Sequence, residues 1–326
     1  MKKIIFPSKN KPAVVIENLD PNQMNLFTVN KKALLKRRPA LIGINDKGQR
    51  QIRARSEKEM FLPSSIQSDQ LTVFSHLQGE HLWGRICFNH FGHFLMESLA
   101  VVYYLKRTPS FKGKLLWTMQ GTDKTSLNKW QTELCSLLDI KERVKIISEP
   151  TSVESLKIIE PGFMIATSLI KEQKEALAVC QGQPPKKGKK IWLSRSKLTS
   201  QNITNALEIE PILEAAGWEL YHPQDHSIAD QITHIRDAEI VAGFEGSAFY
   251  LFMLIDNFQG TVVCIPRYGG LNGNLDLIKQ AYALTLKEIY IPYEEVYSPK
   301  DEGKLQRHMN YKVKNIEKLT AYMLNF

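Results

Sequence analysis

Three residues near the start of one apolar segment, His90, His93 and Glu97, have the types and the spacing of a proton-transfer site. The segment 86–107 reads ICFNHFGHFLMESLAVVYYLKR, and as a helix it places the three side chains within an arc of about 60°. The rest of that face of the predicted helix is apolar, so the three polar side chains lie at one end of a buried element. Because buried polar groups need partners, the spot is either satisfied by the protein or lines a cleft that holds a substrate.

A second candidate site follows a predicted strand in the other half of the chain. The segment 238–254, AEIVAGFEGSAFYLFML, reads as an apolar strand, a turn with Gly243 and Gly246, and an apolar helix that begins at Ser247. A glycine turn lets a phosphate approach the backbone, and the free N–H groups of the helix favour negative charge there. A structural turn with Ser247 as helix cap has the same pattern and remains an alternative. Glu245 would repel an anion, so it fits this site only if it accepts sugar or ribose hydroxyls.

Two arginines are expected at the same edge of the predicted sheet. Arg195 follows the strand 190–194, and Arg267 follows the strand that ends at Ile265. In an open α/β sheet, ligands bind at the carboxyl ends of the strands. A guanidinium at that edge can hold a diphosphate through two parallel hydrogen bonds. A solvated surface arginine is the alternative for each position.

The elements that would position these residues form an α/β pattern in two parts. A length of 326 residues exceeds what one core usually supports, so two domains are expected. The first half opens with short β-type runs and then alternates strands with helices, which indicates βα units and a parallel sheet. The predicted strands of this half are 3–6, 13–16, 41–44, 71–74, 114–118, 144–147 and 156–159, and its predicted helices are 90–107 and 126–138.

The second half has a clearer rhythm, typical of a Rossmann-like domain. It follows the segment QGQPPKKGKK (181–190), whose prolines, glycines and lysines predict an interdomain linker. The chain after residue 303 has apolar residues at steps of three and four, which predicts an amphipathic helix that packs back on the first domain. The predicted strands are 190–194, 218–221, 239–243, 261–265 and 288–291, and the predicted helices are 209–216, 228–236, 247–254, 275–284 and 304–326.

Composition narrows the class of protein. The hydrophobic fraction is 43%, yet no run of about 18 apolar residues occurs and the start lacks a signal-peptide pattern, so we expect a cytoplasmic protein. The four cysteines are far apart and show no CxxC pair, which predicts reduced core thiols.

The net charge of +9 indicates anionic partners, and two basic runs contribute, 31–38 and 186–190. Solvated surface charge is one interpretation, and peripheral association with an anionic membrane is another. No aromatic residues interleave with these runs, so nucleic acid is not expected as a partner.

The motifs together resemble glycosyltransferase family 61, in particular bacterial members associated with capsule and lipopolysaccharide synthesis. The resemblance rests on five segments in order: NHFGHFxxE at 89–97, WLSRS at 192–196, GW at 217–218, ADQ at 229–231 and AEIVAGFEGSA at 238–248. It implies a GT-B fold, in which two Rossmann-like domains face a cleft. It also implies inversion at the anomeric carbon and a nucleotide-sugar donor held mainly by the C-terminal domain.

The expected domains are an acceptor-side domain at 1–180, the linker 181–190, a donor-binding domain at 191–295 and the returning helix within 296–326. The expected reaction transfers a sugar from a nucleotide-diphosphate donor to a hydroxyl of a glycan or polysaccharide. Transfer requires a group that takes the acceptor proton and groups that neutralise the departing diphosphate. No D-x-D triplet occurs, so neither a metal nor another cofactor is expected.

The residues expected to carry this chemistry come from both halves. The catalytic base is Glu97 or His93, with the other orienting it, and the sequence does not decide between them. The remaining expected site residues are Asn89 and His90 for the acceptor, and Arg195, Ser196, Glu245, Gly246, Ser247 and Arg267 for the donor.

Three alternatives stay open at this point. His90, His93 and Glu97 could hold a transition metal in a hydrolase, although their spacing is not H-E-x-x-H. The histidines could be satisfied by backbone carbonyls in a core. The chain could also be a non-catalytic binder of nucleotides or polyanions, for which a basic surface would suffice.

Overall fold

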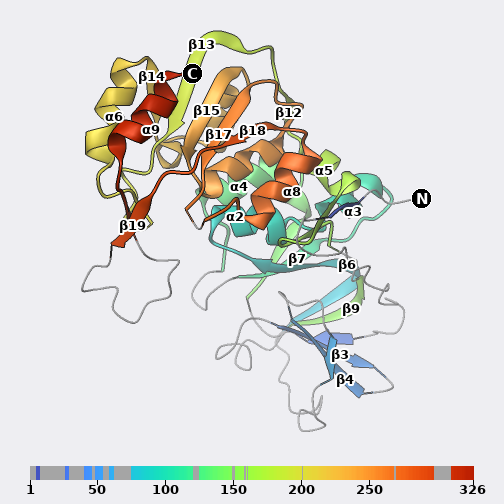
Figure 1. Cartoon of the computed structure of the whole chain (residues 1–326). Helices are drawn as coiled ribbons and strands as arrows, with labels where there is room; N and C mark the ends of the chain where they lie inside the picture. The colour runs from blue at the N-terminus through green and yellow to red at the C-terminus, as the bar shows by residue number, and fades with distance from the viewer. Residues whose placement is uncertain are drawn as a thin grey trace. The chain divides into compact units, whose positions relative to one another are not determined.

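The computed structural model describes residues 75–119, 125–148, 151–157, 159, 161–199, 201–267, 269–296 and 310–326, together with five short strands before residue 62 (Figure 1). The chain divides into two compact units, Met1–Leu177 and Ala178–Phe326. Both units combine helices with parallel strands, so the α/β class is confirmed. Within the described residues, no helix is long and apolar enough to cross a membrane.

The first unit is built on a mixed sheet of eight strands. Its order is β5-β4-β3-β2-β9-β6-β7-β8, with parallel pairing from β9 to β8 and antiparallel pairing among the other strands. The long strand β6 pairs with β9 through its first half and with β7 through its second half. The strands are β2 (Leu26–Thr28), β3 (Ala40–Asn45), β4 (Gly48–Arg53), β5 (Glu59–Phe61), β6 (Ser75–Cys87), β7 (Leu115–Met119), β8 (Val144–Ile147) and β9 (Thr151–Lys157).

A smaller sheet and two helices complete the described part of this unit. The order of that sheet is β1-β11-β10, with both pairs antiparallel. The amide side chain of Asn128 caps α4 through a capping box with Gln131, so this helix begins three residues later than predicted. The elements are β1 (Ile5–Pro7), α4 (Lys129–Leu137), the 3₁₀ turn η4 (Lys141–Arg143), β10 (Phe163–Met164), β11 (Ser168–Ile170) and α5 (Lys171–Leu177).

The predicted helix 90–107 is not continuous. It consists of α2 (Phe91–His93), a π-helical segment η3 (Phe94–Ser98), and α3 (Val102–Arg107). The π geometry is closed by the hydrogen bond of Leu99 N to Phe94 O at 3.0 Å. Single-turn π segments are rare and recur at functional sites. The sequence could not show this break, because its apolar residues continue through it.

Other predictions for the first unit are correct, shifted or outside the described residues. Strand β8 matches its predicted bounds, and β3 and β7 differ by a residue at either end. The run predicted at 156–159 overlaps only the last two residues of β9, which begins five residues earlier. The predicted strands 13–16 and 71–74 and the basic run 31–38 lie outside the described residues.

The second unit contains an all-parallel sheet with the order β14-β13-β15-β17-β18. In chain order this is 2-1-3-4-5, a doubly wound arrangement whose ligand crevice lies between strands 1 and 3. Here that position is the carboxyl edge between β13 and β15. The strands are β13 (Lys186–Leu193), β14 (Trp218–Tyr221), β15 (Ala238–Phe244), β17 (Thr261–Ile265) and β18 (Thr285–Glu288). Strand β18 lies three residues before its predicted position.

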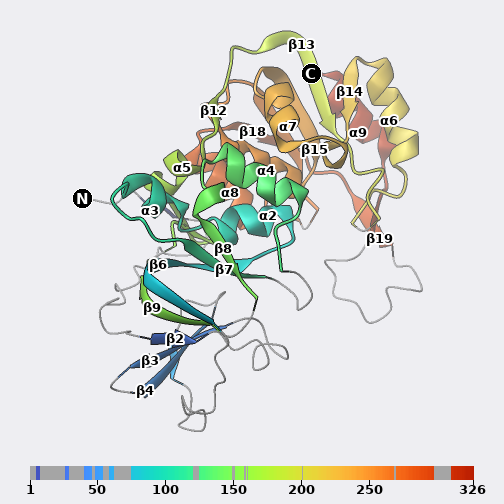
Figure 2. The same ribbon diagram turned by 180° about the vertical axis from the view of Figure 1, so that it is seen from behind.

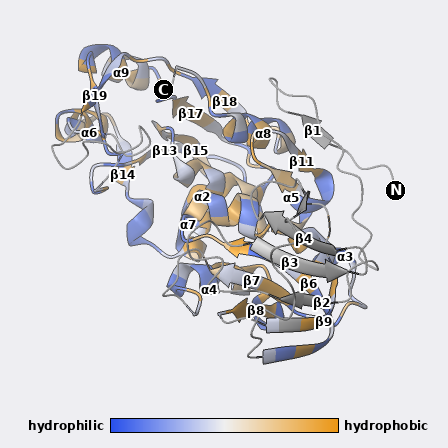
Figure 3. Cartoon of the chain, turned by 90° about the horizontal axis from the view of Figure 1, so that it is seen from below, coloured by the Kyte–Doolittle hydropathy of each residue, from blue (hydrophilic) through white to orange (hydrophobic). Residues whose placement is uncertain are grey.

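Helices cover this sheet on both faces. One face buries Trp192, Ala242 and Val263 against α6 and α9, while α7 lies on the other face, as the two opposite views show (Figures 1 and 2). Helices α6 and α9 alternate polar and apolar colours in Figure 3, as amphipathic helices do. The helices are α6 (Ala206–Ala215), the 3₁₀ turn η5 (Pro223–Asp225), α7 (Ile228–Ile235), the 3₁₀ helix η6 (Ser247–Leu254), α8 (Gly273–Ala281) and α9 (Ile316–Leu324).

The predicted linker is wrong in its second half, because the basic run 186–190 forms the start of β13. The first residue of the predicted linker ends the short strand β12 (Cys180–Gln181), which pairs with β16 (Ile255–Asp256). Lys186 and Lys189 each form an ion pair with the buried Asp237 at 2.6 Å. Burial opposes the charge of Asp237, but hydrogen bonds from Lys186 and Lys189 lower its pKa to about 2. Two lysines of this run, Lys186 and Lys189, are therefore ion-paired within the fold.

The prediction for the C-terminal segment is also wrong. Residues 310–313 form β20 (Asn310–Val313), which pairs with β19 (Tyr293–Val296), and the described helix of this segment is Ile316–Leu324. Helix α9 packs within the second unit. Its Leu319 and Met323 join the core of the second unit, where Trp218 Nε1 donates to Met323 O at 3.3 Å.

Candidate functional site

The predicted proton-transfer pair is present in the first unit. Nδ1 of His93 lies 2.6 Å from Oε1 of Glu97, across the π-helical turn. The Glu97 side chain is 10% exposed and that of His93 is 33% exposed, so the carboxylate is the inner partner and the ring is the outer one. Nε2 of His93 makes no hydrogen bond within the described residues. The imidazole therefore has one nitrogen held by a buried carboxylate and one available to a ligand.

A buried serine holds this turn against the end of β6. The hydroxyl of Ser98 accepts from Phe88 N at 2.9 Å and donates to Ile86 O at 2.7 Å. Trp117 Nε1 on β7 donates to Ser98 O at 2.9 Å, and its ring packs edge-on against Phe94. These contacts fix the π-helical turn to two strands of the sheet, which limits the motion of the His93–Glu97 pair. Sequence reasoning missed Ser98, whose only signal was a polar residue in an apolar run.

The two predicted acceptor residues are exposed beside this pair. The ring of His90 lies 5.2 Å from that of His93, centroid to centroid, at a tilt of 59°. Asn89 accepts a hydrogen bond at 2.8 Å from the side chain of Asn128, the residue that caps α4. Trp130, in the first turn of α4, is half-buried and packs edge-on against Phe91. The ring of His93 thus has that of His90 beside it, and the contacts of Asn89 and Phe91 tie the start of α2 to α4.

In the second unit, Arg195 and Gly246 meet at the carboxyl edge between β13 and β15. A Cβ atom at Gly246 would collide with Nη1 of Arg195, so only glycine lets the guanidinium lie against the backbone there. Arg195 Nε donates to Gln201 O at 3.0 Å. The predicted juxtaposition of an arginine with the glycine turn is therefore present at the ligand-binding edge of the sheet.

Arg267 joins the same group of residues. It is 6% exposed, and its Nη1 and Nη2 atoms both donate to Oε1 of Gln201 at 3.2 Å. Its guanidinium carbon lies 5.2 Å from the centre of the Tyr311 ring. Two arginines are thus held through one glutamine, which the sequence analysis did not single out. Gln201 follows β13 in a loop without periodicity, so no local pattern marked it.

Glu245 is buried next to this pair, with 5% exposure. Its Oε1 accepts from Asn272 N at 2.8 Å, whereas Oε2 is buried without a hydrogen-bond partner. Burial raises the pKa of Glu245, although the Asn272 N–H and the nearby charge of Arg267 act in the opposite direction. A buried carboxylate oxygen without a donor is costly unless a ligand supplies one.

The two predicted donor serines, Ser247 and Ser196, have contacts other than those expected. Ser247 begins a 3₁₀ helix rather than an α-helix, and its side chain does not cap it. The Ser196 hydroxyl lies 2.9 Å from that of Ser194. Ser194 in turn donates to the buried carboxylate of Glu210 on α6, a residue that the sequence analysis missed.

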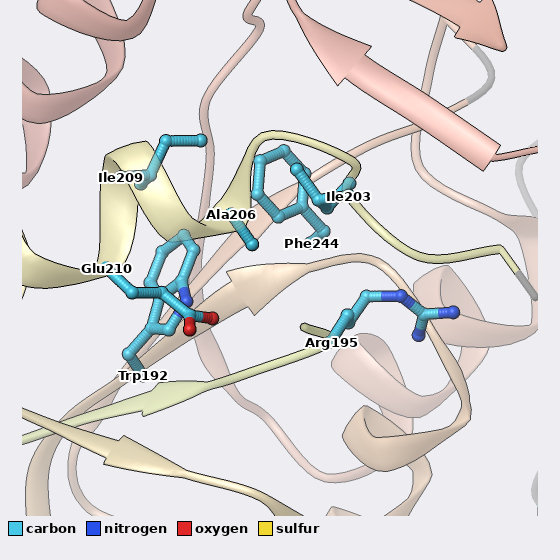
Figure 4. Close-up of a pocket in the computed structure, with 7 residues that line it drawn as sticks. All are labelled: Trp192, Arg195, Ile203, Ala206, Ile209, Glu210 and Phe244. Atoms are coloured by element: carbon cyan, nitrogen blue, oxygen red, sulfur yellow. The ribbon is translucent and has the colours of Figure 1, made fainter. Parts of the chain in front are cut away.

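Glu210 and Arg195 border a narrow pocket whose free space is too small for a water molecule. Trp192, Ile203 and Phe244 form apolar walls of this pocket. Figure 4 shows the guanidinium of Arg195 directed away from the Glu210 carboxylate. The two groups are therefore separate, and the charge of Arg195 is not neutralised by Glu210.

The described residues contain no group of three or more His, Cys, Asp or Glu side chains that could hold a metal ion. His90, His93 and Glu97 belong to this described part, so the metal-hydrolase alternative lacks the ligand set that it proposed. The four cysteines are free and three of them are buried, as predicted. Burial raises the pKa of Cys135 to about 12, which makes its thiol unreactive.

Comparison with known proteins identifies the family of this chain. No curated protein matches the chain significantly. The family model described as Glycosyltransferase 61 matches residues 91–264, more than half of the chain. The matched region includes His93 and Glu97 in the first unit, and Arg195 and Gly246 in the second. The chain therefore belongs to glycosyltransferase family 61.

Proposed function

We propose that this chain is an inverting, metal-independent glycosyltransferase that moves a sugar from a nucleotide-diphosphate donor to a hydroxyl of a glycan. Membership of family 61 supports glycosyl transfer. The observation that carries the donor class is the contact of Arg195 with Gly246 at the crevice of a doubly wound sheet. The further proposals, a GT-B arrangement and a capsule or lipopolysaccharide acceptor, rest on the sequence resemblance.

The second unit would stabilise the leaving group. As the bond from the anomeric carbon to the diphosphate breaks, its electron pair leaves with the diphosphate and negative charge develops there. Arg195 and Arg267 supply positive charge, and Gly246 lets the backbone approach. Fixed cationic donors of this kind can replace a metal ion in neutralising the charge.

The first unit would supply the base. Glu97 accepts the Nδ1 proton of His93, which selects the tautomer whose Nε2 carries a lone pair. Nε2 then takes the proton of the acceptor hydroxyl as the oxygen bonds to the anomeric carbon from the side opposite the diphosphate. The sequence left the base open between Glu97 and His93, and the burial of Glu97 favours His93 as the base and Glu97 as its orienting partner.

Glu245 would recognise a neutral part of the donor. An anionic carboxylate disfavours a phosphate beside it, whereas its unpartnered Oε2 can accept a hydroxyl hydrogen. We assign this oxygen to a hydroxyl of the donor sugar or of the ribose. Arg195 would then bind the diphosphate of the donor, and Glu245 would bind a hydroxyl of its sugar or ribose.

The test is turnover with a panel of nucleotide-diphosphate sugars in the presence of a glycan acceptor and a metal chelator. We expect release of nucleoside diphosphate that depends on the acceptor, and a product whose anomeric configuration, measured by NMR, is opposite to that of the donor. Retention of configuration would contradict the single-displacement mechanism. Loss of activity with chelator, restored by a divalent ion, would contradict metal independence.

A further inference from the structure

We infer that Gln201 is a positioning residue that holds Arg195 and Arg267 together as one site for a diphosphate. This inference rests on the proposed function, since it concerns how the donor site is assembled. It adds a residue that neither the motif pattern nor the resemblance pointed to.

The hydrogen bonds of Gln201 are divided between the two arginines. Its main-chain oxygen accepts from Arg195 Nε at 3.0 Å, and its side-chain oxygen accepts from both terminal nitrogens of Arg267 at 3.2 Å. A neutral amide oxygen orients a guanidinium without cancelling its charge. A carboxylate in the same place would form an ion pair and compete with the ligand.

The backbone of Gln201 is held in an uncommon conformation. Its φ angle is +55°, in the left-handed region that non-glycine residues rarely adopt. The next residues are fixed to β20, because Tyr311 N donates to Asn202 O at 3.0 Å and Thr204 N donates to Tyr311 O at 2.8 Å. A strained residue that is held by its surroundings is typical of a ligand-binding site.

The same strand also supports the second arginine. Tyr311 is 1% exposed, and the guanidinium carbon of Arg267 lies 5.2 Å from the centre of its ring. One short strand therefore fixes both the loop that carries Gln201 and the arginine that Gln201 binds. The two arginines are bound to different oxygens of one residue, and Arg267 also has the Glu245 carboxylate near it. A ligand with two adjacent negative groups fits this arrangement, because the two cations repel each other.

The test measures binding of inorganic pyrophosphate and of orthophosphate to the full chain by calorimetry. Gln201→Gly removes the side chain and allows the positive φ, so relief of backbone strain offsets part of the stability lost with the hydrogen bonds to the buried Arg267, and we expect the fold to be kept. We expect the Kd for pyrophosphate to rise about tenfold, with little change for orthophosphate, because only the pairing of the arginines is lost. A structural role alone would not alter the ratio of the two constants.

Gln201→Glu sharpens the test, since it keeps an acceptor for Arg267 but adds a negative charge. We expect it to fold as the wild type does and to bind pyrophosphate at least as weakly as Gln201→Gly. The matched control is Gln183→Ala, an exposed glutamine of the same unit that is bound through its backbone N–H to Arg236 O, and it should bind both anions normally.

The possible results separate the two proposals. If wild type binds pyrophosphate and Gln201→Gly binds it equally well, the role of Gln201 is wrong while the donor site stands. If wild type binds neither pyrophosphate nor any nucleoside diphosphate, the proposed donor site itself is contradicted.

Discussion

The two proposed sites, one in each unit, are built in different ways. In the first unit, His93 and Glu97 are four residues apart and meet across one turn of one element. In the second unit, Arg195 and Gln201 share the loop after β13, whereas Gly246 follows β15 and Arg267 follows β17, and these three loops meet only through the parallel order of the sheet. The proposed base is therefore local in sequence, whereas the proposed anion site depends on the whole sheet. Substitutions in the two sites should change different kinetic and binding parameters.

The largest effect is expected in the local half. His93→Ala should lower kcat by about 10²- to 10⁴-fold, because it removes the proton acceptor. Glu97→Gln should lower kcat less, since the ring remains but its tautomer is no longer fixed. Measurements are initial rates with saturating donor, together with the Kd for nucleoside diphosphate. If either variant weakens nucleotide binding as strongly as it slows turnover, the separation of base and anion site between the two units is contradicted.

The next effect is expected in the global half and in the opposite parameter. Arg195→Ala should raise the Kd for nucleoside diphosphate by about 10- to 100-fold, the range for losing charge-assisted hydrogen bonds to phosphate. Arg195→Lys should recover only part of the affinity, because a point charge lacks the planar fork. Calorimetry gives the constants, and Lys187→Ala, an exposed lysine at the other end of β13, is the matched loss of charge. Equal weakening in both variants would show that only net charge matters.

The smallest effect is expected at Glu245, and there it has an unusual sign. Burial raises the pKa of this carboxyl above its value in the unfolded chain. Once the pH exceeds the pKa of a free glutamate, ionisation of Glu245 therefore destabilises the unliganded fold. Glu245→Gln should therefore raise the melting temperature near pH 8, with no gain near pH 4, while weakening donor binding. Thermal melts across this pH range provide the measurement. A lower melting temperature at pH 8 would mean that the charge stabilises the fold through Arg267.

The same contrast explains what could be predicted from the sequence. Spacing found the His93–Glu97 pair, because an i,i+4 relation survives even though the helix is locally a π-helix. Alternation of strands and helices placed Arg195 and Gly246 at the correct edge, since all parallel strands end there. Gln201 could not be found, because its role depends on a left-handed backbone angle and on β20, which lies more than a hundred residues later.

The errors have similar physical causes. The apolar residues of the C-terminal segment fit a helical period, but Tyr311 and Val313 also fit a strand period, and pairing with β19 selects the strand. The lysine-rich run at 186–190 has a composition typical of a linker. Ion pairs with Asp237 and pairing with β15 make it a strand instead, with Gly188 at φ +80° where the register shifts.

Strand β20 has a practical consequence for anyone who shortens the protein. Asn205 exchanges two side-chain hydrogen bonds with the backbone of Val313, both at 3.0 Å, so this strand anchors the loop behind the two arginines as well as the helix that follows it. A variant that stops before Asn310 would lose the contacts that hold this loop, and with them the proposed diphosphate site, even though no arginine had been deleted. Inactivity of such a truncation would report loss of that proposed site and should not be taken as evidence that the tail recognises the acceptor.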